Sequence, residues 1–285
     1  MKLLSCHASG TDTFGVVLDS EFVDARPIAE EVGYTLAEAI SRGALERLGR
    51  WAVAGQRTMP LTSVAMLPVI PNPGKILCVG INYMGHVKET GRDVPRYPML
   101  FTRFADSQTA HGSAIVRPTV SSHLDFEGEL AVIIGKLAWR VKARDALTHV
   151  AGYSCYNDGT LRDWQRHTLQ FTPGKNFPRT GGFGPWMVTP DEVGDVSALT
   201  LTTRLNGEVT QSAPLNDLIF NVPALIEYCS SFTVLRPGDV IVTGTPAGVG
   251  AFRQPPLWMK PGDLVEVEIS KIGTLRNTIA DEIQS

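Results

Sequence analysis

Three carboxylate side chains near the middle of the chain have a spacing that suits a metal site. Glu127 and Glu129 are two residues apart in the segment 125–130 (DFEGEL), and Asp158 follows the next strand-like segment. On an extended strand this spacing puts both glutamates on one face, about 6.5 to 7 Å apart. An all-oxygen pocket completed by Asp158 favours Mg²⁺ or Mn²⁺ over zinc, because it includes no thiolate or imidazole. The same acids also fit a solvated strand edge followed by a turn aspartate.

A histidine and a glutamate further upstream have the spacing of a general base and its orienting partner. His86 and Glu89 lie in the segment 80–91, three residues apart. On a helix these positions are neighbours, so the carboxylate could orient and polarise the imidazole. A solvated helix surface carries the same pair more often, and the residue types alone do not separate the two interpretations.

Polar and basic residues downstream suggest a loop that folds around a small ligand. Arg162 and Gln165 precede Lys175, which follows Gly174. Loop glycines allow the backbone to approach a ligand closely, although a flexible surface loop with a solvated lysine fits equally well. Arg103, at the end of an expected strand, either faces an anionic substrate or pairs with a surface acid.

Strands are expected to position these side chains. The segment 75–80 reads as a buried strand that leads to His86, and 130–135 continues the glutamate strand inward. The segment 151–156 reads as a strand that delivers Asp158. Further on, Asn206-Gly207 is a strong hairpin signal. The best helix candidate of the second half is 215–232, with an apolar face at helical spacing.

Composition indicates a globular protein rich in strands and turns. The 285 residues include 27 glycines and 19 prolines, which argues against a helical bundle. Lys and Arg number 26 against 29 Asp and Glu, and both signs are interspersed. This balance lacks the basic footprint of a nucleic-acid-binding protein, so we expect a small-molecule ligand and no nucleic-acid partner.

The first 70 residues differ in pattern from the rest. Residues 1 to about 25 alternate as in a hairpin, and Thr35 and Glu38 have capping-box spacing before an apolar helical stripe. Four prolines between 60 and 73 then punctuate the chain, as expected at a domain entry. We therefore expect a small N-terminal α/β domain over 1–70 and a catalytic domain over 71–285.

Cysteine usage and hydropathy indicate a reducing compartment. The four cysteines are far apart without CxxC spacing, which predicts buried free thiols rather than a zinc ribbon or a disulfide scaffold. The first residues are too briefly apolar for a signal peptide, and no segment resembles a membrane span. We expect a cytoplasmic protein with no membrane partner.

Taken together, these segments resemble the fumarylacetoacetate hydrolase family over roughly residues 75 to 280. The resemblance rests on five motifs in the family's order, namely GINY at 80–83 with His86 and Glu89, DFEGEL at 125–130, ND at 157–158 with RD at 162–163, GK at 174–175, and TGTPAGVG at 243–250. It implies an α+β fold with a mixed β-roll or β-sandwich-like catalytic domain wrapped by helices. It also implies a homodimer.

The resemblance implies a role for each candidate residue. Glu127, Glu129 and Asp158 match the family's ligands for Mg²⁺ or Mn²⁺, and His86 with Glu89 matches a water-activating dyad on a lid. The positions that hold the substrate or stabilise developing charge are matched by Lys175, Arg162, Gln165 and Thr245. Thr160 and Leu161 replace the Ser-Ala that commonly precedes the Arg-Asp pair, so the local pocket shape differs from the common pattern.

The implied activity is hydrolysis of an acylpyruvate, of the fumarylpyruvate or maleylpyruvate type, to pyruvate and an acid in aromatic-compound breakdown. A metal and Lys175 would stabilise the pyruvate enolate that this cleavage releases. Because enolate stabilisation also serves oxaloacetate decarboxylation and keto-enol or double-bond isomerisation, these reactions form the alternative. A non-catalytic metal and keto-acid binding protein is a more distant third possibility.

Overall fold

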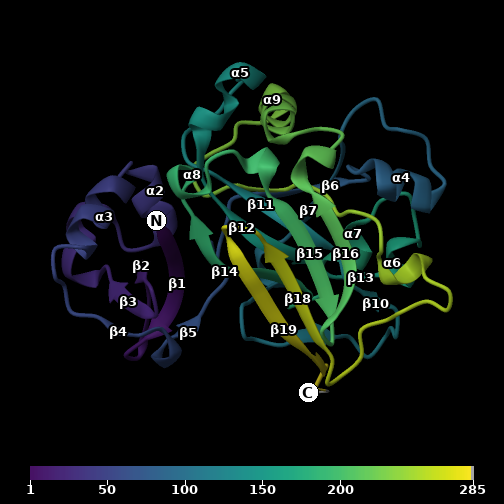
Figure 1. The fold of residues 1–285 in the computed structure, drawn as a ribbon, viewed down its shortest axis with the longest axis horizontal. Helices are drawn as coiled ribbons and strands as arrows, with labels where there is room; N and C mark the ends of the chain where they lie inside the picture. The colour runs from purple at the N-terminus through teal and green to yellow at the C-terminus, as the bar shows by residue number, and fades with distance from the viewer. Residues whose placement is uncertain (284–285) are drawn as a thin grey trace.

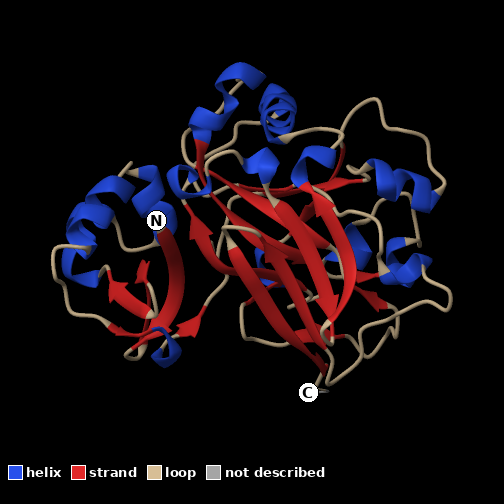
Figure 2. Cartoon of the chain, in the orientation of Figure 1, coloured by secondary structure: helices blue, strands red, loops and turns tan. Residues whose placement is uncertain are grey.

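Two large β-sheets form the body of the protein, and helices lie around their edges (Figure 2). The computed structural model describes residues 1–283. The larger sheet has the order β4-β3-β2-β1-β14-β12-β11-β17-β6-β7, with β5 paired to β1 and β8 to β14. Its strands are β1 (Lys2–Ala8), β2 (Thr11–Leu18), β3 (Glu21–Asp24), β4 (Met59–Pro60), β5 (Ala65–Met66), β6 (Ile76–Gly80), β7 (Met99–Arg103), β8 (Gln108–Ala110), β11 (Gly128–Ile134), β12 (Val150–Asp158), β14 (Gly181–Val188) and β17 (Val240–Val242).

The second sheet lies in front of the first in Figure 1 and has the order β16-β15-β18-β19-β9. Its strands are β9 (Ile115–Arg117), β15 (Thr200–Leu205), β16 (Glu208–Pro214), β18 (Leu264–Ile269) and β19 (Gly273–Asp281), while β10 (Leu124–Asp125) and β13 (Thr160–Leu161) form a separate pair. Asn206 and Gly207 connect β15 to β16 with φ of 52° and 84°. These positive values confirm the expected hairpin turn.

The α-helices are short and few, as the composition predicted. They are α1 (Ala29–Val32), α2 (Leu36–Ser41), α3 (Leu45–Ala52), α4 (Met84–Thr90), α5 (Ala143–Ala146), α6 (Arg162–Gln165), α7 (Thr172–Lys175), α8 (Pro190–Val193) and α9 (Val222–Phe232). Within residues 1–283, no helix is both long and apolar enough to cross a membrane. The four cysteines are buried free thiols, as expected.

The helix expected over 215–232 begins later than the apolar pattern suggested. Residues Leu215–Asp217 form a 3₁₀ turn, and α9 starts at Val222 with Asn221 as its N-cap. The Asn221 side chain accepts a hydrogen bond from the Ala224 amide at 3.0 Å, and Pro223 lies in the first turn. Proline is favoured there and cannot continue a helix from upstream, so the cap fixes the start.

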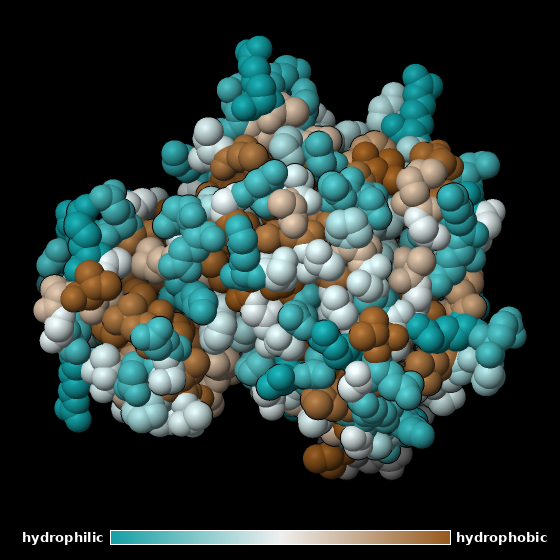
Figure 3. Space-filling model, in the orientation of Figure 1, coloured by the Kyte–Doolittle hydropathy of each residue, from teal (hydrophilic) through white to brown (hydrophobic). Residues whose placement is uncertain are grey.

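The N-terminal strands continue the large sheet. β1 pairs antiparallel with β14, and Thr35 caps α2 by accepting a hydrogen bond from the Glu38 amide at 3.1 Å. In Figure 1 this part lies at the left, and Figure 3 shows apolar side chains gathered over it among hydrophilic ones. The boundary near residue 70 stays a prediction, and the last two residues of the expected second domain lie outside the described part.

The main core lies between the two sheets. Leu130 and Val132 of β11 belong to the same buried cluster as Leu201 of β15, Val267 of β18 and Leu275 of β19. Burial of each such aliphatic side chain contributes about 1.5 to 3 kcal/mol relative to exposure. The core therefore fixes β11, the strand on which the glutamates depend.

Candidate active site

The pairing of β11 with β12 brings the three carboxylates together. Gly128 lies opposite Asn157 in this antiparallel ladder, so the residues beside this pair, Glu127 and Asp158, become neighbours. Asp158 donates its amide to the Glu127 carbonyl at 2.8 Å. Oxygens of Glu127, Glu129 and Asp158 lie within 4.8 Å of one another, and all three residues are buried.

Glu127 is placed differently from the expected strand position. β11 begins at Gly128, so Glu127 precedes the strand that carries Glu129. Its amide donates to Asn157 Oδ1 at 2.9 Å instead of to a ladder carbonyl. Strand geometry therefore fixes Glu129, whereas the hydrogen bond to the Asn157 side chain fixes the backbone of Glu127 just before the strand.

Two cations hold Glu127 and Asp158 in place. Lys175 Nζ lies 2.6 Å from Glu127 Oε2 and 2.5 Å from Asp158 Oδ2, while Arg162 Nη2 lies 2.6 Å from Glu127 Oε1. Burial by itself would raise the pKa of Glu127, but Arg162 and Lys175 outweigh it and lower the pKa to about 2. Glu127 is therefore ionised at neutral pH.

Glu129 has the opposite electrostatic environment. Its pKa is raised well above the ordinary value, first by burial and then by the negative charges of Asp158 and Glu127. The Gly244 amide donates to its Oε2 at 2.5 Å, which compensates only part of this effect. Arg162, Lys175 and Arg103 contact Glu127 and Asp158, whereas within residues 1–283 no cation forms an ion pair with Glu129, so its charge is the one without a cationic partner.

The donor set fits a hard divalent cation. Three carboxylates supply oxygen ligands only, which suits Mg²⁺ or Mn²⁺. Oxygens that accept a hydrogen bond from Lys175 or from Gly244 keep a second lone pair. A divalent charge would also offset the repulsion that raises the pKa of Glu129.

Arg103 lies in a different place from the one expected for a substrate contact. Its guanidinium is fully buried and contacts Asp158 Oδ1 at 2.6 Å, the Gly159 carbonyl at 3.0 Å and Thr180 Oγ1 at 2.7 Å. It does not line the cavity beside the glutamates. Arg103 therefore positions Asp158, and its partner is a buried acid of the site rather than a surface acid.

The helix α4 presents the expected histidine and glutamate as a hydrogen-bonded pair. His86 Nδ1 lies 2.7 Å from Glu89 Oε2, and Glu89 Oε1 accepts a hydrogen bond from the Gly248 amide at 2.8 Å. A carboxylate only accepts hydrogen bonds, so Nδ1 carries the proton in the neutral imidazole. His86 lines the cavity, which leaves Nε2 as the atom that can accept a proton from a ligand.

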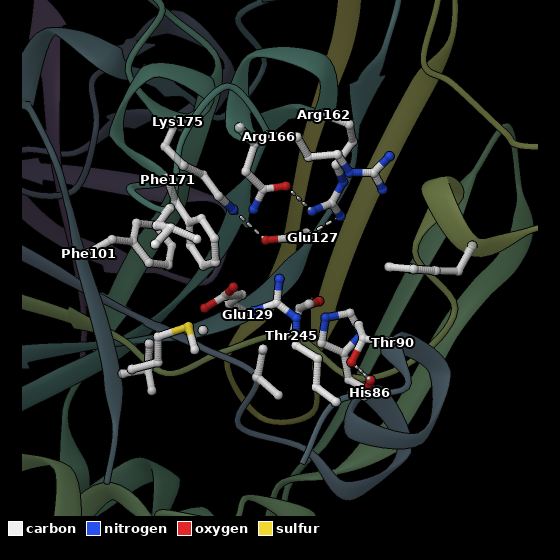
Figure 4. Close-up of a pocket in the computed structure, with 18 of the residues that line it drawn as sticks. His86, Thr90, Phe101, Glu127, Glu129, Arg162, Arg166, Phe171, Lys175 and Thr245 are labelled. Atoms are coloured by element: carbon white, nitrogen blue, oxygen red, sulfur yellow. Dashed lines mark hydrogen bonds and ion pairs between the residues drawn. The ribbon is translucent and has the colours of Figure 1, made fainter. Parts of the chain in front are cut away.

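A cavity of about 550 Å³ connects the carboxylates with this pair. Figure 4 shows Lys175 and Arg162 on one side of Glu127, with His86 and Thr90 on the other. Of the remaining candidates, Gln165 and Thr245 also line the cavity, and Asp158 is buried behind it. Apolar walls are supplied by Met99, Phe101, Phe171 and Phe252.

Sequence reasoning left two buried supporting residues unassigned. Asp125 accepts hydrogen bonds from Arg162 Nε at 2.7 Å and from the Gly250 amide at 2.7 Å, which ties the arginine to the glycine-rich loop. Gln211 donates to Thr245 Oγ1 at 2.8 Å and accepts from the Gly128 amide at 3.0 Å. The sequence could have indicated Asp125, because it belongs to the acidic motif 125–130. Gln211 lies on β16, where no neighbouring residue in the sequence indicates a role.

Comparison with known proteins identifies the family. The family model described as fumarylacetoacetate hydrolase, C-terminal, matches residues 75–280. The chain belongs to the fumarylacetoacetate hydrolase family. The resemblance and the mixed-sheet fold inferred from the sequence are thereby confirmed.

Relatives in this family differ in their activities. The chain is 41% identical over 249 residues to human oxaloacetate tautomerase FAHD2A, mitochondrial, covering 86% of this chain and 79% of the relative. Fumarylacetoacetate hydrolase from Exiguobacterium antarcticum superposes with a TM-score of 0.87 at 33% identity, covering 99% of this chain and all of the other. Maleylpyruvate hydrolase from Sphingobium, solved with manganese(II) and pyruvate, gives 0.83 at 25% identity with the same coverage.

Proposed function

We propose that this protein is a metal-dependent keto-enol tautomerase that acts on oxaloacetate. The observation that carries the proposal is the 41% identity to an oxaloacetate tautomerase over most of the chain, joined to a hydrogen-bonded His86 and Glu89 at the same cavity as the carboxylates. The proposed reaction is keto-enol isomerisation, which was the alternative in the sequence analysis, and not the acylpyruvate hydrolysis that the sequence first suggested.

His86 supplies the proton transfer that tautomerisation requires. Its Nε2 takes a proton from the methylene carbon next to the keto group, so a C–H bond breaks and an N–H bond forms. The electron pair forms a carbon–carbon double bond and leaves negative charge on the keto oxygen. Glu89, fixed by the Gly248 amide, stabilises the imidazolium, which returns the proton to that oxygen to give the enol.

Positive charge at the cavity wall stabilises the enolate oxygen. Burial by itself would lower the pKa of Lys175, but Asp158 and Glu127 outweigh it and raise the pKa, so the ammonium persists at neutral pH. Arg162 adds a second fixed positive charge. Glu127, Glu129 and Asp158 would hold a Mg²⁺ or Mn²⁺, which would supply Lewis-acid chemistry at the keto acid.

The test follows the ultraviolet absorbance of enol-oxaloacetate after it is added to protein with Mn²⁺, compared with Mn²⁺ alone. We expect the protein to accelerate the decay of the enol signal to the keto-enol equilibrium without releasing more pyruvate than Mn²⁺ alone does. Decay at the Mn²⁺-only rate would contradict the proposal. Pyruvate release from oxaloacetate faster than with Mn²⁺ alone would instead identify a decarboxylase.

Acylpyruvate hydrolysis is the second candidate, and the likeness to maleylpyruvate hydrolase favours it. A cavity of about 550 Å³ also has room for an acyl chain longer than that of oxaloacetate. In this reaction the His86 imidazole would activate a water for attack on the distal carbonyl. Release of pyruvate from fumarylpyruvate or maleylpyruvate, measured with lactate dehydrogenase, distinguishes this activity from tautomerisation.

A further inference from the structure

Two arginines at the cavity have no acidic partner among residues 1–283. Arg92 and Arg166 both line the cavity and are exposed at its mouth. Within residues 1–283, neither guanidinium has a carboxylate within the 4.0 Å of an ion pair. Arg162 and Lys175 each contact a buried acid, whereas the charges of Arg92 and Arg166 are balanced by no such contact and remain available to a distal group of a ligand.

The backbone and a neighbouring ring fix Arg92 at this position. Gly91 ends α4 with φ of 65°, and the Arg92 amide donates to the Val87 carbonyl at 3.3 Å, which is the pattern of a Schellman turn. The Arg92 guanidinium lies 5.9 Å from the centre of the Phe171 ring, within cation-π range. Phe171 also lines the cavity, so the guanidinium is held against the cavity wall.

Arg166 approaches from a different element. It is the C-cap residue of α6 and directly follows Gln165, which accepts a hydrogen bond from Arg162 at 3.0 Å. Arg92 instead follows α4, the helix that carries His86. The two guanidinium groups thus come from two separate segments of the cavity lining, one following the helix that carries His86 and Glu89 and one following the helix that carries Arg162.

The cavity therefore has acids at its floor and unpaired positive charge at its mouth. Glu127 and Glu129 are the acids of its lining, and both are buried. A ligand that matches this charge pattern has one end that chelates a metal and a second anionic group further out. Guanidinium groups recognise carboxylates with charge-assisted hydrogen bonds, which are stronger than neutral ones.

We propose that Arg92 and Arg166 are specificity-determining residues that bind a second carboxylate, at the end of the substrate remote from its 2-keto acid group. The substrate class is then a 2-keto dicarboxylate. The proposal rests on the proposed function only in placing the 2-keto acid end at Glu127, Glu129 and Asp158. It applies equally to a tautomerase and to a hydrolase of acylpyruvates with a distal carboxylate.

A matched pair of stable ligands tests this proposal without turnover. 2-Oxoglutarate and 2-oxopentanoate have the same chain length, but a methyl group replaces the distal carboxylate in the second. Calorimetry with Mn²⁺-loaded protein measures the affinity for each. We expect the wild-type protein to bind 2-oxoglutarate about tenfold or more tightly than 2-oxopentanoate, in line with a charge-assisted hydrogen bond.

Single variants assign the preference to the two arginines. R92Q and R166Q should each reduce the affinity for 2-oxoglutarate about tenfold and leave that for 2-oxopentanoate unchanged. R92K and R166K should each bind 2-oxoglutarate more tightly than the corresponding glutamine variant, because lysine keeps the positive charge. The control R144Q alters an exposed arginine on α5, outside the cavity, and should change neither affinity.

The outcomes separate this proposal from the proposed function. Equal affinity of wild-type protein for both ligands, or equal loss for both in R92Q and R166Q, overturns the assignment, as does binding of neither ligand. If the expected selectivity is found but enol-oxaloacetate decays at the Mn²⁺-only rate, the tautomerase proposal fails and the carboxylate site stands.

Discussion

His86 shows how far residue types and spacing can lead. Its three-residue separation from Glu89 allowed either a hydrogen-bonded pair or a solvated helix surface, and the 2.7 Å contact on α4 shows the hydrogen-bonded pair. What the spacing could not give is the second contact of Glu89, to the Gly248 amide, because that residue is distant in sequence. Arg103 shows the opposite case, since its expected partner was a ligand or a surface acid and its actual partner is the buried Asp158.

The role of His86 leads to a test by substitution. H86A should lower the rate of enol-oxaloacetate decay by about 10² to 10⁴-fold, because it removes the proton acceptor. Mn²⁺ affinity, measured by calorimetry, should change little, since His86 is not among the carboxylate cluster. The control H7A alters an exposed histidine of β1 and should keep full activity. Unchanged turnover in H86A would remove the pair from the mechanism.

The raised pKa of Glu129 predicts a pH dependence of stability. Above its ordinary value of 4.5 the unfolded chain releases this proton while the folded protein still holds it. The metal-free protein should therefore lose stability as pH rises from 4.5 towards the folded pKa, by at most about 1.4 kcal/mol per pH unit from this group.

E129Q provides the comparison. Glutamine keeps an oxygen for the Gly244 amide but carries no charge, so the metal-free variant should be more stable than wild-type protein at neutral pH. Its Mn²⁺ affinity should fall by more than about 100-fold, which exceeds the loss usually seen when a residue that only contacts a metal ligand is replaced. Urea unfolding between pH 4.5 and 8 measures the first effect, and a parallel pH profile of the two proteins would contradict the assignment.

Among the helices and strands, the sequence correctly predicted the features that depend on residues close together in the chain. The Asn206-Gly207 turn and the Thr35 cap depend on neighbouring residues, and both were found as expected. The start of α9 was predicted too early because apolar periodicity outweighed the Asn221 cap and Pro223. Glu127 preceded its strand because Asn157, a residue on another strand, accepts its amide.

Asn82 connects the elements that position His86. It is fully buried just before α4, and its side chain bonds the Thr243 carbonyl at 2.7 Å, the Phe220 carbonyl at 3.0 Å and the Phe220 amide at 2.8 Å. N82A should reduce the free energy of unfolding by about 3 kcal/mol, because three hydrogen bonds are lost. It should also slow turnover more than it weakens Mn²⁺ binding.

Urea unfolding and enol decay measure these two effects. The control N72A removes an exposed asparagine and should change the free energy of unfolding by less than about 0.5 kcal/mol. Equal stability of N82A and N72A would show that Asn82 does not hold the start of α4.

For the whole molecule, the strand-rich composition and five ordered motifs were enough to predict the family and its mixed sheets. The order of strands in the large sheet was not predictable, because β1 pairs with β14 and β17 with β6 across long stretches of sequence. The meeting of Arg92 and Arg166 at one cavity was not predictable for the same reason, since the two residues are distant in sequence. The expected homodimer stays a prediction, which sedimentation velocity tests.

The three carboxylates link metal binding to the stability of the whole chain, because Glu129 has no ion-pair partner within residues 1–283. A cation that binds the folded protein at about 100 times its dissociation constant should raise the free energy of unfolding by about 2.7 kcal/mol. We expect Mn²⁺ and Mg²⁺ to raise the melting temperature of wild-type protein and EDTA to reverse the effect. D158N should lose this response, because one of the three ligands is weakened, whereas D12N, at an exposed aspartate of β2, should keep it. An equal rise in D158N and wild-type protein would place the metal elsewhere, since the response would not depend on the carboxylates that β11 and β12 bring together.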